Sequence, residues 1–193
     1  MKSILFIISS IRLIPHFIFL KIKCDNKIIN RDIERWMKLM NRIKSINYSF
    51  FYLMTFVPEF RNLYYYRLGK LSNLINWICP KMNTLFIATK DIGSGLFLQH
   101  GFSTIIAAKS IGKNCWINQQ VTIGYSNETD CPIIMDNVII HAGAKVIGDV
   151  IIGNNCIVGA NAVVVKNVPP NCVVVGVPAI IVKKNGQKVN IKL

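Results

Sequence analysis

The chain has 193 residues, 52% of them hydrophobic, so it can bury a sizeable core in one domain or in a small domain plus an extension, which argues against disorder. Six cysteines without a CxxC pair are too sparse for a disulfide framework and favour a reducing, cytoplasmic compartment. The net charge is +14 and is concentrated in residues 1–90, which carry 15 basic and 4 acidic side chains. This basic half suggests a polyanion or an anionic membrane surface as a neighbour, with a solvated basic face as the alternative. The sequence has no zinc-finger spacing, RNP-like aromatic motif or basic heptad region, which argues against nucleic acid.

Residues 1–20, MKSILFIISSIRLIPHFIFL, are apolar but are interrupted by Arg12, Pro15 and His16. The uninterrupted apolar run is too short to span a bilayer. We predict an apolar helix that rests at the inner face of the cell membrane or packs against a partner, and we expect no catalytic role for His16. Four basic residues would then lie near lipid headgroups: Arg12, Lys21, Lys23 and Lys27.

Two further segments predict helices. Five apolar residues of segment 31–44 share one face at helical spacing: Ile33, Trp36, Met37, Met40 and Ile43. We expect the charged residues Asp32, Glu34 and Lys38 to lie outside this face. Residues 60–78 predict another helix, and Pro80 ends the region. The sequence therefore predicts a basic helical region over residues 1–84 that contacts a membrane or joins subunits.

A six-residue repeat follows. Counting by sixes from Ile134 reaches only branched aliphatic residues, and the position four after each is small or medium-sized and apolar. The first set is Ile140, Val146, Ile152, Val158 and Val164, and the second is Val138, Ala144, Val150, Cys156, Ala162 and Val168. Upstream, we expect the same inward position to be held by Ile105, Ile111, Ile117 and Ile123, with glycines after several of them helping the backbone to turn.

A period of six is typical of neither a helix nor an alternating strand. It suits a prism-shaped coil with three flat faces, in which stacked coils bury a continuous aliphatic column. We therefore predict a mainly β solenoid over residues 85–185, followed by a short C-terminal tail over residues 186–193. Residues 124–133, GYSNETDCPI, interrupt the period with a polar loop, which is either a place for function or a tolerated insertion.

These repeats resemble the hexapeptide-repeat acyltransferases. The segment NAVVVKNVPPNCVVVGVPAIIVKK is similar to the family's closing segment, and the helical half followed by DIGSGLFLQHG resembles the serine acetyltransferase branch. The resemblance implies a left-handed parallel β-helix, acetyl-CoA as the acyl donor, and a homotrimer with active sites between subunits.

The same resemblance bears on His100, which is otherwise readable as a satisfied structural histidine on an apolar strand. The family's catalytic histidine lies in a Leu-Asp-His motif that aligns with Leu98-Gln99-His100, which implies that His100 is the general base of a direct transfer. The chemistry agrees, because a hydroxyl that attacks a thioester needs a base poised near neutral pH.

Other positions depart from the serine acetyltransferase pattern. The family's Asp before the histidine is Gln99 here, its loop Arg-His pair is Asp130-Cys131, and the carboxylate that orients its histidine corresponds to Leu85. A closer resemblance is to the serine-acetyltransferase-like proteins of capsule and surface-polysaccharide synthesis. It implies a sugar hydroxyl as acceptor, on a sugar, a nucleotide sugar or a lipid-linked glycan, with Gln99, Asp130 and Cys131 beside it. The alternatives are a serine O-acetyltransferase of cysteine biosynthesis and a non-catalytic scaffold for a glycan-synthesis enzyme.

Two further roles stay open. Cys131 is a candidate nucleophile, although the neighbouring Asp130 would raise the pKa of its thiol. His141 is a backup base, with a surface histidine as the alternative. A zinc lyase on the same solenoid needs three histidine ligands, and only His100 and His141 lie in the repeat, so we expect no metal.

Family resemblance also implies where acetyl-CoA lies, along the outside of the later coils. The expected contacts are Ala142, Gly143, Ala160, Lys166, Pro178 and Lys183. Cationic side chains there suit the phosphates of CoA, with simple solvation as the alternative.

Overall fold

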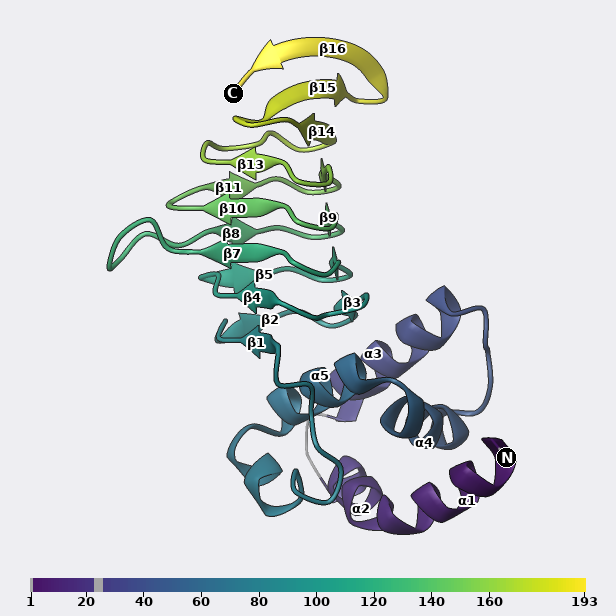
Figure 1. Cartoon of the computed structure of the whole chain (residues 1–193). Coiled ribbons are helices and arrows are strands. Elements are labelled where there is room, and N and C mark those ends of the chain that lie inside the picture. Colours follow the sequence, from purple (N-terminus) through teal and green to yellow (C-terminus); the bar gives the residue numbers. More distant parts are fainter. Residues whose placement is uncertain (1, 23–25) are drawn as a thin grey trace. The chain divides into compact units, whose positions relative to one another are not determined.

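The protein is described from a computed structural model that covers residues 2–22 and 26–193 (Figure 1). The predicted headgroup contact Lys23 lies outside the described residues. The chain divides into two compact units, Met1–Asn83 and Thr84–Leu193. The first is helical and the second is a stack of short strands, and each is described by itself.

Among its described residues, the helical unit holds five α-helices and a 3-10 turn. They are α1 (Lys2–Arg12), α2 (Ile14–Ile22), α3 (Asn26–Leu39), α4 (Ile46–Phe56), α5 (Pro58–Leu68) and η1 (Gly69–Leu74). The predicted helix over 60–78 thus breaks at Gly69, which takes a positive φ of 61°. The largest buried side chains of this unit, Trp36, Phe50, Phe60 and Tyr64, form its core.

The expected apolar face of segment 31–44 is confirmed only in part. Ile33, Trp36 and Met37 are buried, but Ile43 is 81% exposed. The reason is that α3 ends at Leu39, and Asn41 turns the chain with a φ of 54°. Helical spacing therefore stops before it reaches Ile43.

The expectation that Asp32 lies outside the buried face is wrong. Asp32 is buried, and the Nε of Arg67 donates to its Oδ2 at 2.9 Å. A carboxylate enters a core only when a partner compensates its charge. That partner lies 35 residues away on α5, so local spacing did not indicate it.

The second unit is a parallel β-helix with three sheets, one for each side of the prism (Figure 1). Sheet A consists of β1 (Leu85–Ile87), β4 (Thr104–Ile106), β7 (Thr122–Gly124), β10 (Lys145–Ile147) and β13 (Val163–Val164). Sheet B consists of β2 (Asp91–Ile92), β5 (Ser110–Ile111), β8 (Ile133–Ile134) and β11 (Ile151–Ile152). Sheet C consists of β3 (Phe97–Leu98), β6 (Trp116–Ile117), β9 (Ile139–Ile140), β12 (Ile157–Val158), β14 (Cys172–Val175), β15 (Ile180–Lys184) and β16 (Gln187–Lys192).

Sheet C ends differently from the other two. β14, β15 and β16 pair in antiparallel fashion, so the chain folds back on itself at the last coil. The predicted tail, residues 186–193, contains β16. This hairpin covers the final coil of the prism (Figure 1).

The predicted aliphatic column is confirmed from Ile111 onward. The residues at the six-residue period, including Ile117, Val146 and Ile152, are no more than 2% exposed. Ile105 is the exception, because it is 45% exposed and Ile106 takes the inward position. Register explains this, since Ile106 pairs with the inward Ile123 and Ile105 pairs with Thr122.

The expected role of the glycines is also corrected. Gly93, Gly112 and Gly153 have ordinary negative φ, but a Cβ on each would lie within 2.5–2.9 Å of the next coil's backbone. They are therefore needed for close approach between coils rather than for turning. Asparagine is the most frequent non-glycine residue at the left-handed positions of the β-helix. Asn155 links two of these asparagines, accepting from Asn137 at 3.1 Å and donating to Asn171 at 2.9 Å.

Candidate active site

His100 lies in a two-residue insertion at the corner between sheets C and A. Leu98 pairs with Ile117, and Ile105 pairs with Thr122, so seven steps in the first coil match five in the second. The extra length contains His100 and Gly101. His100 is exposed and adopts a left-handed φ of 60°, which is uncommon for a residue with a side chain. The insertion therefore places His100 at an exposed corner of the prism and not on an apolar strand.

The neighbouring coil carries polar side chains at this corner and on the strand that leads to it. Three buried polar atoms have no hydrogen-bond partner among the residues that the structure describes: Trp116 Nε1, Asn118 Oδ1 and Gln119 Oε1. An unsatisfied buried polar group costs about 1–3 kcal/mol, so such a cluster is an unusual feature at a structural corner. Sequence reasoning missed it, although the polar run Asn118-Gln119-Gln120 after the inward Ile117 was a readable signal.

Two of the predicted residues continue this corner. The half-buried Gln99 is in register with Asn118, and its N–H donates to the Ile117 carbonyl oxygen at 2.9 Å. His141 occupies the equivalent place two coils beyond Gln99. At a strand spacing of about 4.8 Å, the two positions are about 10 Å apart. His141 is half-buried, so part of its side chain is accessible, and it stays the alternative candidate for the base.

The polar loop extends from a different corner, between β7 and β8, where sheet A meets sheet B. Asp130 is occupied within the loop, because Asn127 Nδ2 donates to its Oδ2 at 2.7 Å and its own N–H donates to Asn127 Oδ1 at 2.9 Å. Cys131 is half-buried and hydrogen-bonded to the hydroxyl of Tyr125, which raises the pKa of that phenol. Asp130 therefore shapes the loop through Asn127, and its oxygens do not project free into a site.

The structure does not bring His100 together with Asp130 and Cys131 in one chain. The width of sheet A separates the two corners, roughly 13 Å at about 3.3 Å per residue. Each corner carries part of the predicted acceptor site.

The predicted cofactor residues divide between the same two corners. Ala142, Gly143 and Ala160 lie on the later coils of the His100 corner, whereas Lys166 follows β13 at the loop corner. Glycine is also needed at position 143 for structural reasons. Its φ is 75°, and a Cβ there would overlap the side chain of Asn161.

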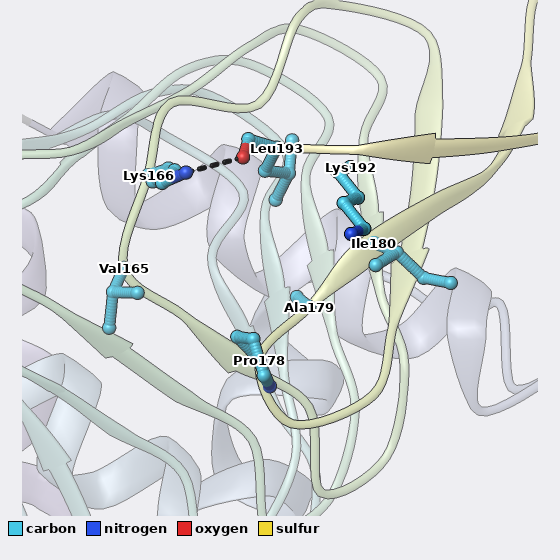
Figure 2. Close-up of a pocket in the computed structure, with 7 residues that line it drawn as sticks. All are labelled: Val165, Lys166, Pro178, Ala179, Ile180, Lys192 and Leu193. Carbon is cyan, nitrogen blue, oxygen red and sulfur yellow. Dashed lines mark hydrogen bonds between the residues drawn. The ribbon is translucent and has the colours of Figure 1, made fainter.

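One cavity of about 380 Å³ contains two of the predicted residues, Lys166 and Pro178, but not Lys183 (Figure 2). Its lining also includes Val165, Ala179, Ile180, Lys192 and Leu193. Lys166 Nζ donates to the Leu193 carbonyl oxygen at 2.6 Å. Two ammonium groups over an apolar floor fit an anionic group attached to a flexible chain, as in CoA.

In residues 2–22 and 26–193, no three or more His, Cys, Asp or Glu side chains gather as a metal site would require. His100 and His141 stand on separate coils.

Parts of the chain are similar to known proteins. Residues 131–166 match the family model described as bacterial transferase hexapeptide (six repeats). The serine acetyltransferase of Synechococcus elongatus is 34% identical over 133 residues, which is 66% of this chain and 54% of that protein. The serine acetyltransferase of Staphylococcus aureus (strain COL) is 44% identical over 102 residues, 51% of this chain and 48% of the relative. The chain thus spans about half the length of the curated relatives that it matches.

Solved structures agree. Neisseria gonorrhoeae serine acetyltransferase in complex with serine superposes with a TM-score of 0.68 at 27% identity, covering 83% of this chain and 70% of that one. The Brucella abortus serine acetyltransferase gives 0.69 at 26% identity, covering 87% and 73%. These relatives are serine acetyltransferases, so the predicted capsule branch receives no support from them. The second unit is a left-handed parallel β-helix, its residues 131–166 match the hexapeptide repeats of bacterial transferases, and the chain is similar in sequence and structure to serine acetyltransferases.

Proposed function

We propose that this protein transfers an acetyl group from acetyl-CoA to the hydroxyl of a small acceptor, with His100 as the general base. The observation that carries the proposal is the two-residue insertion that exposes His100 at a corner of the β-helix. The homology to serine acetyltransferases supports the reaction class.

In the proposed reaction, the imidazole of His100 accepts the hydroxyl proton while the hydroxyl oxygen bonds to the acetyl carbonyl carbon. The carbon–sulfur bond of the thioester then breaks, and the departing thiolate takes the proton back from the imidazolium. A backbone N–H near Gly101 would stabilise the negative oxygen in between. This route needs no acyl-enzyme, so Cys131 keeps only a packing or acceptor-contact role.

Serine is the acceptor to test first, because the relatives are named for it and one matching structure holds serine. A sugar hydroxyl is the second candidate. Two residues favour a sugar. Gln99 replaces the family's Asp, which would meet the amine of serine, and Asp130 takes the position of the family's Arg, which would bind the carboxylate of serine. An amino acid acceptor would meet neither charge partner at these positions.

We also propose a homotrimer, as the family resemblance implies. The His100 corner holds the base and the loop corner holds Cys131 and Lys166, with sheet A between them. Packing the His100 corner of one copy against the loop corner of the next would complete each site. Head-to-tail packing of this kind closes into a ring when the rotation permits.

The test measures CoA release by the full chain with acetyl-CoA and either L-serine, nucleotide sugars or lipid-linked glycans. Turnover with serine supports the first acceptor, and turnover only with sugars supports the second. If acetyl-CoA neither binds nor turns over with any of them, the non-catalytic scaffold is the better account.

A further inference from the structure

The first two helices expose a row of isoleucines. α1 and α2 run one after the other as a bent segment at the edge of the helical unit (Figure 1). Six side chains on this segment are between 49% and 71% exposed: Ile7, Ile8, Ile11, Ile14, Ile18 and Ile22. At 3.6 residues per turn they fall within an arc of about 120°, and we name this surface the isoleucine face.

The opposite side of the same helices is firmly packed. Ser9, Leu13, His16 and Leu20 are at most 3% exposed and recur at helical spacing. His16 Nε2 is hydrogen-bonded to the Tyr65 hydroxyl at 2.9 Å. α1 and α2 therefore pack against the helical unit through this buried side. The isoleucine face is their solvent-facing side.

Helical geometry persists where the two helices meet. The Leu13 N–H donates to the Ser9 carbonyl at 3.1 Å, and the Phe17 N–H donates to the Leu13 carbonyl at 3.0 Å. Pro15 has no N–H to donate, which accounts for a bend at this point. In the described parts of the chain, we find no helix with both the length and the apolarity to cross a bilayer.

Basic residues border the isoleucine face. Arg12 and Lys21 are exposed and, by helical spacing, fall on its two edges. Lys27, near the start of α3, is also exposed. The exposed Ile43 stands between Arg42 and Lys44, directly before α4, where Asn47 Oδ1 accepts from Lys21 Nζ at 3.3 Å. Of the four acidic residues in this half, Asp32 is buried in its pair with Arg67, so it does not offset the surface charge.

We propose that the isoleucine face binds an anionic lipid surface, with α1 and α2 lying in the plane of the headgroups. An apolar stripe bordered by cations is the arrangement by which interfacial helices bind such membranes. A second copy of this chain fits less well, because its own basic borders would repel those of the first, whereas anionic headgroups neutralise them. This role does not depend on acetyl transfer, and it would place the enzyme at a membrane surface.

The test is sedimentation of the full chain with vesicles of phosphatidylcholine, with and without phosphatidylglycerol. We expect binding to the mixed vesicles, weaker binding to pure phosphatidylcholine, and partial loss in high salt. The variant Ile7→Ser/Ile18→Ser should lower binding by about 10-fold or more, since two exposed apolar anchors are removed. The matched control is Ile151→Ser/Ile191→Ser, which changes two exposed isoleucines of the β-helix and should bind as the native chain does.

Two results would overturn the proposal. One is equal vesicle binding by the two variants. The other is no vesicle binding by the native chain; a smaller oligomer for Ile7→Ser/Ile18→Ser in sedimentation velocity would then make a second copy the occupant. All substituted positions are exposed, so circular dichroism should show the native fold in each variant.

Discussion

The helical unit and the β-helix bury their residues by different rules. In the β-helix, every six residues return the chain to the same environment, so one register fixes the inward positions of a whole coil, as for Val146, Ile152 and Val158. In the helical unit, the partners come from distant segments, as for Asp32 with Arg67 and His16 with Tyr65. Burial can therefore be predicted from the sequence where the chain repeats. It cannot be predicted from local spacing where a buried polar residue pairs with a distant partner.

The largest expected loss of stability lies in the helical unit. Asp32→Ala removes the carboxylate and leaves Arg67 buried without its charge partner, which should lower the free energy of unfolding by about 3–5 kcal/mol. Urea unfolding followed by the helical circular dichroism signal measures this. Glu34→Ala is the control, because Glu34 pairs with Arg31 at 3.8 Å on the surface, and its loss should cost less than about 1 kcal/mol. Equal losses of unfolding free energy in the two variants would mean that the buried pair contributes no more to stability than the surface pair.

Neighbouring isoleucines test the β-helix in the same way. Ile152 is fully buried and Ile151 is 44% exposed, although they are consecutive in β11. Ile152→Ala should cost about 2–5 kcal/mol through lost burial and a cavity. Ile151→Ala should cost well under half of that in the same thermal and urea unfolding experiments. If the order were reversed, the inward register would be wrong.

Much of the fold could be predicted because the repeat is self-consistent. The prediction failed where the coil changes length, and Ile105 was misplaced because the insertion at His100–Gly101 shifts the phase. It also failed for the glycines, since spacing shows where a glycine lies but not the backbone packed against it. For the candidate site, His100 was predicted by resemblance, whereas the unpaired atoms of Trp116, Asn118 and Gln119 needed coordinates.

A further prediction concerns close approach between coils. A Cβ on Gly112 would lie 2.6 Å from the carbonyl carbon of Met135, so Gly112→Ala should cost about 1–3 kcal/mol through overpacking. Gly124→Ala is the matched control, because the nearest atom to its Cβ would be 3.9 Å away, on Thr122. Thermal unfolding of both variants compares them directly. A Gly112→Ala protein as stable as the control would show that the coils have room to separate.

The helical unit should also give a pH dependence of stability. Burial lowers the pKa of His16 from 6.5 to about 4; a backbone contribution from Ile75 opposes this shift, and the positive charges of Arg12 and Arg61 add to it. Between these values the unfolded chain binds a proton that the folded chain excludes, so stability should fall as the pH falls from 6.5 toward 4. Urea midpoints across this range should decline less steeply in His16→Gln. An identical slope in that variant would assign the decline to other groups.

The central claim is that His100 removes the acceptor's proton, and the most direct measurement is the acetyl-transfer rate of His100→Ala beside His141→Ala. We expect His100→Ala to lose about 10²–10⁴-fold in kcat with an unchanged circular dichroism spectrum, because general base catalysis contributes that much. His141→Ala should stay near the native rate. Full activity in His100→Ala, with the loss appearing in His141→Ala instead, would contradict the account and move the base two coils along the helix.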